Sequence, residues 1–132
     1  MANPNIVAVA TINGGNAGWN LTAGLTDTLL TVSGSDVIVK LNRIVCTNVD
    51  GSSAYDLNLF IDGMGTAAAN GLTPNAADTT VYIAKTISIP ADASLVVSDT
   101  PIYLMEGDSL KGGGSTVNKL DLFISYEVLD DA

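Results

Sequence analysis

The chain has 132 residues, of which 47% are hydrophobic and only 14% are charged, so it is long enough for one folded domain and too apolar for an intrinsically disordered protein. It contains no histidine and one cysteine, which excludes the Ser-His-Asp triad, His-ligated zinc sites and internal disulfide bonds. The chain has five basic and 14 acidic residues. Its net charge of -9 disfavours direct binding to nucleic acid, because phosphates repel such a chain.

Strand patterns recur along the chain, and helical periodicity is almost absent. Alternation of apolar and polar residues marks Tyr55–Asp62 and Leu120–Val128 as half-buried antiparallel strands. Val37–Cys46 is apolar on both faces at several points, which favours a central strand or one buried beneath a neighbouring subunit. Weaker strand patterns cover Asn5–Ile12, Thr28–Val32, Val81–Ile89, Leu95–Val97, Ile102–Met105 and Ser109–Lys111.

These segments amount to about eight strands, at the spacing typical of a sandwich or barrel. We therefore predict one all-β domain over residues 1–132, an antiparallel β-sandwich that is jelly-roll-like. Gly and Asn pairs between apolar runs, such as Asn13-Gly14, indicate tight turns. Residues 1–5 are expected to form an N-terminal arm and residues 63–78 a long surface loop. Gly112–Gly114 is expected to be a flexible tip between two strands.

The side chains that could perform catalysis form no convincing constellation. Twelve aspartates make carboxylate pairs unavoidable, for example Asp56 and Asp62 on one strand face, but a solvated acidic face explains them better than a glycosidase pair does. A Ser-Lys dyad of Ser88 and Lys85 is disfavoured because a separation of three on a strand places the two side chains on opposite faces. We expect a non-enzymatic protein that needs no cofactor.

Three further features have two interpretations each. Oxygen ligands gather around one predicted turn, at Asn48, Asp50, Ser52 and Asp56. The glycine and glutamate of an EF-hand are missing there, so an Asx turn is the default and a bound cation the alternative. Cys46 alternates with core positions, which predicts a buried small hydrophobe rather than a reactive thiol. The lone tryptophan, Trp19, lies in a glycine-rich context and is either an interface anchor or a plug at one end of the sandwich.

The ends and apolar runs give an expectation for location. The first apolar run, Ile6–Ala10, is far shorter than the ~20 residues that a membrane-spanning helix requires. The N-terminus lacks the basic region of a signal peptide, so we expect synthesis in a cytoplasm without export by the general route.

Four segments carry a family resemblance, in the order Val39–Gly51, Ile87–Leu95, Ile102–Lys111 and Ile124–Glu127. Together they resemble small virion structural proteins of tailed bacteriophages, especially phages of cyanobacteria, over about two-thirds of the chain. The letters GDSL at Gly107–Leu110 are expected to be a turn between strands and not the esterase motif, because that motif lies near the N-terminus and requires a histidine. The resemblance implies a jelly-roll-like sandwich that decorates capsids or lies on tail structures.

On this resemblance we expect a capsid decoration (cement) protein on the outer surface of the virion, which clamps major capsid subunits and stabilises the mature shell. The expected partners are the major capsid protein or other virion proteins, together with further copies of the chain, a trimer being favoured; no membrane is expected. The alternatives are a tail, neck or fibre adaptor or receptor-binding component, and a carbohydrate-binding module. The residues expected at an interface are Trp19, Asn3, Pro4, Asn5 and Leu72.

Overall fold

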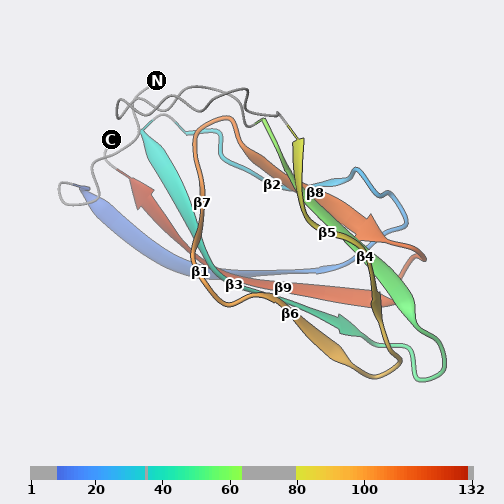
Figure 1. Cartoon of the computed structure of the whole chain (residues 1–132). Helices are drawn as coiled ribbons and strands as arrows, with labels where there is room; N and C mark the ends of the chain where they lie inside the picture. The colour runs from blue at the N-terminus through green and yellow to red at the C-terminus, as the bar shows by residue number, and fades with distance from the viewer. Residues whose placement is uncertain (1–8, 35, 64–79, 131–132) are drawn as a thin grey trace.

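The computed structural model of the chain describes residues 9–34, 36–63 and 80–130. In these ranges nine β-strands form two antiparallel sheets that pack face to face (Figure 1), and no helix is present. The predicted all-β antiparallel sandwich is confirmed, with nine strands where about eight were expected. Four expected interface residues and the predicted loop after Gly63 lie outside the described residues; the four are Asn3, Pro4, Asn5 and Leu72.

Each sheet contains strands from both halves of the chain. The larger sheet has the order β1 (Thr11–Asn20), β9 (Leu120–Asp130), β3 (Val37–Asn48) and β6 (Ser94–Ser98), and β7 (Ile102–Leu104) also pairs with β3. The smaller sheet has the order β2 (Thr28–Thr31), β8 (Ser109–Gly114), β4 (Tyr55–Asp62) and β5 (Thr80–Ile89). The first strand therefore pairs with the last, and β1 lies at an edge of the larger sheet.

The core lies between the sheets and follows from the alternation of the central strands. In β9, Leu122 and Ile124 are almost completely buried, and in β4, Leu57 and Leu59 are fully buried. Burying one such side chain stabilises the fold by roughly 1.5–3 kcal/mol relative to leaving it in water. Cys46 on β3 is also fully buried, as predicted, and this burial is the main reason that the pKa of its thiol rises to about 12.

A β-bulge changes the predicted alternation of β3. The register between β3 and β9 shifts between Leu41 and Arg43, which leaves Asn42 as the extra residue. As a result Leu41 and Ile44 both face the core, whereas Arg43 is exposed. The bulge also divides β3 into a part that pairs with β7 and a part that pairs with β6.

Two predictions about glycine-rich segments are wrong. The expected turn at Asn13-Gly14 lies within β1, whose ladder with β9 is uninterrupted over ten residue pairs. Of the expected strand Asn5–Ile12, residues 5–8 lie outside the described residues, and Thr11 and Ile12 are the first two residues of β1. The expected flexible tip at Gly112–Gly114 is the buried end of β8. A Cβ atom at Gly112 would lie 2.0 Å from the backbone oxygen of Asn58, so this glycine allows β8 and β4 to approach each other.

Candidate docking site

An apolar row crosses the outer face of the larger sheet. The pairing registers align Gly18 of β1 with Phe123 of β9, Phe123 with Val45 of β3, and Val45 with Val96 of β6. These residues point away from the core, because their chain neighbours Leu122, Cys46 and Leu95 pack into it. Phe123 is 46% exposed and Val96 45% exposed. We refer to Phe123, Val45 and Val96 together as the outer strip.

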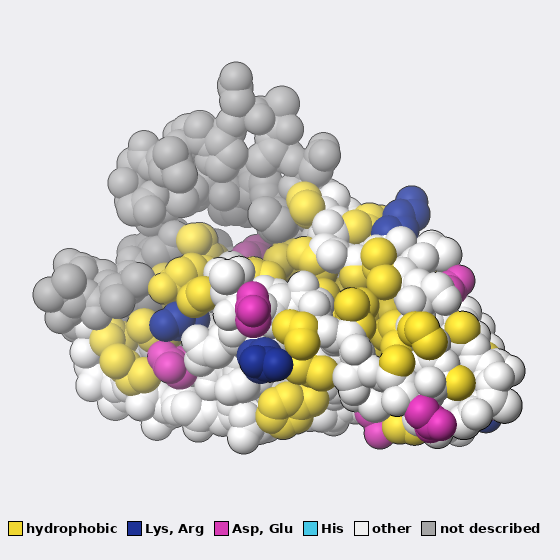
Figure 2. All heavy atoms as spheres, turned by 60° about the horizontal axis from the view of Figure 1, so that its bottom comes forward, with side chains coloured by type: hydrophobic (Ala, Val, Ile, Leu, Met, Phe, Trp, Pro, Cys, Tyr) yellow, Lys and Arg dark blue, Asp and Glu magenta, His cyan; other side chains and the backbone are white. Residues whose placement is uncertain are grey.

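Polar rows border the outer strip on both sides. On one side Asn20 Nδ2 donates to Asp121 Oδ1 at 2.7 Å, and the hydroxyl groups of Thr47 and Ser94 lie 2.8 Å apart. The row on the other side contains Asn16, Ser125 and Arg43. Figure 2 turns the bottom of Figure 1 forward and shows groups of exposed hydrophobic side chains with isolated charged ones between them. An apolar centre with a polar rim is the usual anatomy of a protein–protein interface.

A shallow hollow of about 490 Å³ adjoins the strip, and we call it the outer hollow. Its lining residues are Gly18, Trp19, Asn20, Thr47, Asp121, Leu122 and Phe123. Gly18 is the residue of β1 that pairs with Phe123, and because it has no side chain, β1 places no side chain beside the Phe123 ring. The phenyl ring therefore stands at the border of a depression, where a partner side chain can contact both its face and its edge.

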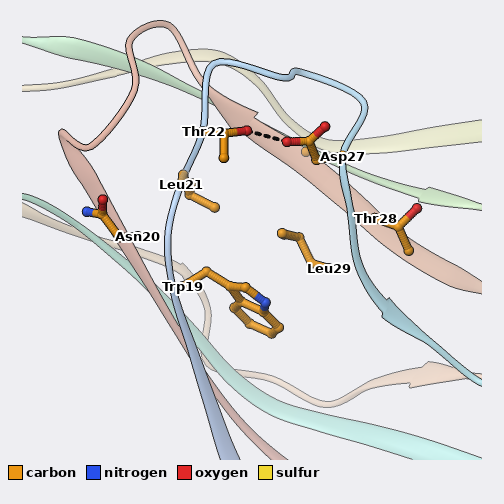
Figure 3. A pocket seen from close by; sticks show the side chains of 8 residues that line it. Trp19, Asn20, Leu21, Thr22, Asp27, Thr28 and Leu29 are labelled. Carbon is orange, nitrogen blue, oxygen red and sulfur yellow. Dashed lines mark hydrogen bonds between the residues drawn. The ribbon is translucent and has the colours of Figure 1, made fainter.

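Trp19 belongs to the inner face of the same strand. It pairs with Leu122 and packs, partly buried, against the core. Figure 3 shows Trp19, Leu21 and Leu29 directed into a crevice of about 170 Å³ between β1 and the segment leading into β2. The Thr22 hydroxyl donates to Asp27 across the loop above this crevice. Trp19 is therefore partly buried at an open side of the sandwich, and its expected role at an interface stays a prediction.

The turn with several oxygen ligands is an Asx turn. Asp50 Oδ1 accepts hydrogen bonds from the backbone N–H groups of Ser52 (2.7 Å) and Ser53 (3.0 Å), and Asp50 Oδ2 accepts one from Lys119 Nζ at 2.7 Å. The Lys119 ammonium and these N–H groups hold the pKa of Asp50 well below its usual range. Fully buried Asn48 completes the turn, because its Oδ1 accepts from the Asp50 N–H at 2.9 Å.

Asp62, one of the two carboxylates considered for catalysis, lies in an ion pair. Asp62 accepts hydrogen bonds from Lys111 Nζ at 2.7 Å and from the Thr80 hydroxyl at 3.0 Å, and both lower its pKa. In residues 9–34, 36–63 and 80–130 no cluster of three or more His, Cys, Asp or Glu side chains could hold a metal ion. Nor does that part of the chain contain a helix with the length and apolarity needed to cross a bilayer.

A second aromatic group lies on the outer face of the smaller sheet. The rings of Phe60 and Tyr82 have centroids 5.1 Å apart, and Lys85 Nζ lies 5.0 Å from the Tyr82 centroid. These partners already engage the Tyr82 ring, and Phe60 is only 5% exposed. The Phe123 ring has no such aromatic or cationic partner among the described residues, which makes the outer strip the stronger candidate for docking.

The sequence marks Phe123 as unusual, because this aromatic residue occupies a polar position in an alternating strand. Within the alternating segment Leu120–Val128, Phe123 lies on the polar face together with Asp121, Ser125 and Glu127. A contiguous apolar patch on the wet face of a sheet marks a contact surface, and Phe123 forms one with Val45 and Val96.

Comparison of the chain with protein-family models, with curated proteins and with solved structures gave no match.

Proposed function

We propose that this chain is a non-enzymatic structural protein of a tailed-phage particle, a decoration protein that docks on the outer surface of the capsid through the outer strip. The observation that supports docking is the apolar row of exposed Phe123, half-buried Val45 and exposed Val96 between polar rows. The identity of the partner rests on the resemblance of four segments to small virion proteins of tailed phages. In this role many weak contacts on identical capsid subunits add up and lower the free energy of the shell.

The strand order supports the proposal at the level of architecture. The first strand pairs with the last, and the two interleaved sheets have the orders β1-β9-β3-β6 and β2-β8-β4-β5. This order supports the jelly roll that we propose, a double-sheet architecture that occurs in viral capsid and lectin domains. The strongly acidic composition also favours a place outside the shell, away from packaged DNA.

Copy number in purified particles tests the proposed place in the virion. Quantitative mass spectrometry should find this chain at a simple ratio to the major capsid protein. A few copies per particle would instead support the tail, neck or fibre role, and absence from the particle would refute both roles. Capsids stripped of the protein should melt at a lower temperature than decorated ones, and an unchanged melting temperature would count against cementing.

A pair of matched variants tests the docking surface. Phe123→Ser removes a half-exposed ring, on the order of 100 Å² of apolar contact, and at ~25 cal/mol per Å² this is about 2.5 kcal/mol, or roughly a 60-fold loss of affinity for stripped capsids. Val117→Ser is the control, because Val117 is 48% exposed but lies in the turn before β9 and not on the strip. Equal binding by both variants and the unchanged chain would show that another surface docks.

One observation favours a carbohydrate-binding module as the second candidate. The outer hollow combines an exposed aromatic ring, Phe123, with the polar pair of Asn20 and Asp121. Sugar recognition requires an apolar platform beside hydrogen-bonding groups of this kind. Binding on a glycan array that is lost in Phe123→Ser would support this role, and a blank array would refute it.

A further inference from the structure

Among the described residues, the edge strands of the two sheets differ in how well they are protected against pairing with another chain. β2 has only four residues, β6 five and β7 three, and short edges pair poorly. β5 has ten residues but shows two register shifts, and Thr86 on it has a positive φ of 53°. β1 has ten residues in unshifted register, with no proline and no charged side chain. No strand in the described ranges covers its other edge.

The hydrogen-bonding groups on that edge can be assigned from the ladder. Leu21, directly after β1, donates its N–H to the Leu120 oxygen at 2.8 Å. Because antiparallel pairing alternates, the bonds to β9 then fall on Trp19, Ala17 and every second residue before them. The N–H and C=O groups of the intervening residues face the free edge. These residues are Ile12, Gly14, Asn16, Gly18 and Asn20, and all five are exposed.

Two glycines among them are not required by the fold of the single chain. A Cβ atom at Gly14 would meet nothing within 4 Å, and one at Gly18 only the Leu122 oxygen at 3.6 Å. Neither residue has a positive φ. Glycine in a strand costs stability, and at these two positions it leaves no side chain on the outer face to shield the N–H and C=O groups of the edge.

We infer that the free edge of β1 pairs in antiparallel fashion with β1 of a second copy, around a twofold axis at Asn16. The outward positions read Gly14, Asn16, Gly18, and this pattern is the same in both directions. In the register centred on Asn16, Gly14 of one copy faces Gly18 of the other, and the two Asn16 residues face each other. β1 contributes no charged side chain to the seam, so two copies place no like charges of this strand opposite each other. The larger sheets then form one continuous sheet, with an isologous contact of the kind that closes dimers.

Sedimentation analysis of matched variants tests the seam. Wild type should form a dimer that dissociates on dilution. Asn16→Pro should be monomeric, because the proline removes an N–H that faces the free edge and leaves the ladder with β9 intact. Asn16→Thr retains the N–H and should dimerise. A monomeric wild type between micromolar and millimolar concentration would overturn the inference, as would dimerisation of Asn16→Pro. A trimer would also overturn it and support the trimer expected from the sequence.

Disulfide crosslinking tests the register even if Asn16→Pro fails to fold. Hydrogen-bonded antiparallel pairs have Cα atoms about 5.5 Å apart, within the range of a disulfide. Asn16→Cys should therefore crosslink to itself on mild oxidation, whereas Gly14→Cys, on the same strand and equally exposed, should not. Native Cys46 is fully buried and does not compete. Absence of crosslinking in Asn16→Cys, or equal crosslinking in both, would refute the register.

Phe123→Ser leaves the seam intact, so failure of the proposed function and failure of this inference are distinguishable.

Discussion

Replacing Gly112 by alanine should destabilise the fold severely, although it adds a single methyl group. The new Cβ would lie 2.0 Å from the Asn58 oxygen and 3.0 Å from the Leu59 Cα, both of them backbone atoms of the neighbouring strand β4. Gly112 also has a φ of 154°, a conformation that L side chains rarely adopt. Overpacking of a core typically costs about 1–3 kcal/mol and an unfavourable backbone conformation about the same, so we expect a loss of roughly 2–6 kcal/mol.

Thermal unfolding followed by circular dichroism measures this loss. At about 4 °C for each kcal/mol in a domain of this size, the melting temperature should fall by roughly 8–24 °C. Gly14→Ala is the matched control, because its Cβ meets nothing within 4 Å, and it should change stability by less than about 1 kcal/mol. If Gly112→Ala melts within a few degrees of wild type, the close approach of β8 and β4 is not the reason for glycine at this position.

Three further changes test the buried polar and titratable groups. Asn48→Leu should cost about 3 kcal/mol in urea unfolding, since Asn48 Nδ2 donates to Ser53 O and Ile89 O at 2.9 Å and both acceptors would lose their partner. Cys46 should not react with a thiol reagent in the native protein but should react fully in denaturant, because its burial raises the pKa to about 12; reaction at native conditions would contradict its position in the core. Asp50→Asn should lower stability at neutral pH. Since the folded-state pKa of Asp50 is lowered, the wild-type advantage should be complete above about pH 4 and should shrink as the pH falls further, and an advantage that grows in acid would refute this.

Local alternation was sufficient to predict the strands that form the core. β4, β9 and most of β3 carry the predicted pattern, because one face of each meets the opposite sheet. The pattern fails at Asn42, where the bulge depends on the register with β9 and not on local sequence. It also fails at Asn58, expected on the wet face but only 9% exposed, because its Oδ1 accepts the Thr86 N–H at the bulge of β5.

The glycines were the main source of error, since one residue type serves three purposes that sequence does not separate. Gly107 has the positive φ of a turn, as predicted for the GDSL segment. Gly15 makes room for a neighbour, because a Cβ there would lie 2.8 Å from the Tyr126 ring. Gly14 and Gly18 serve neither purpose within one chain. Phe123, which is 46% exposed, was not among the residues expected at an interface, because alternation alone places it on the polar face of Leu120–Val128.

The position of Trp19 gives the molecule an internal optical reporter. It is the single tryptophan of the chain, and it lies on the edge strand β1 with its ring between the two sheets, at the crevice shown in Figure 3. Its fluorescence emission therefore comes from one place, the open side of the sandwich between β1 and the segment leading into β2. A red shift during stopped-flow unfolding would time the separation of the sheets at that side. Compared with the circular dichroism of the strands, it would show whether the sandwich opens there before its ladders break.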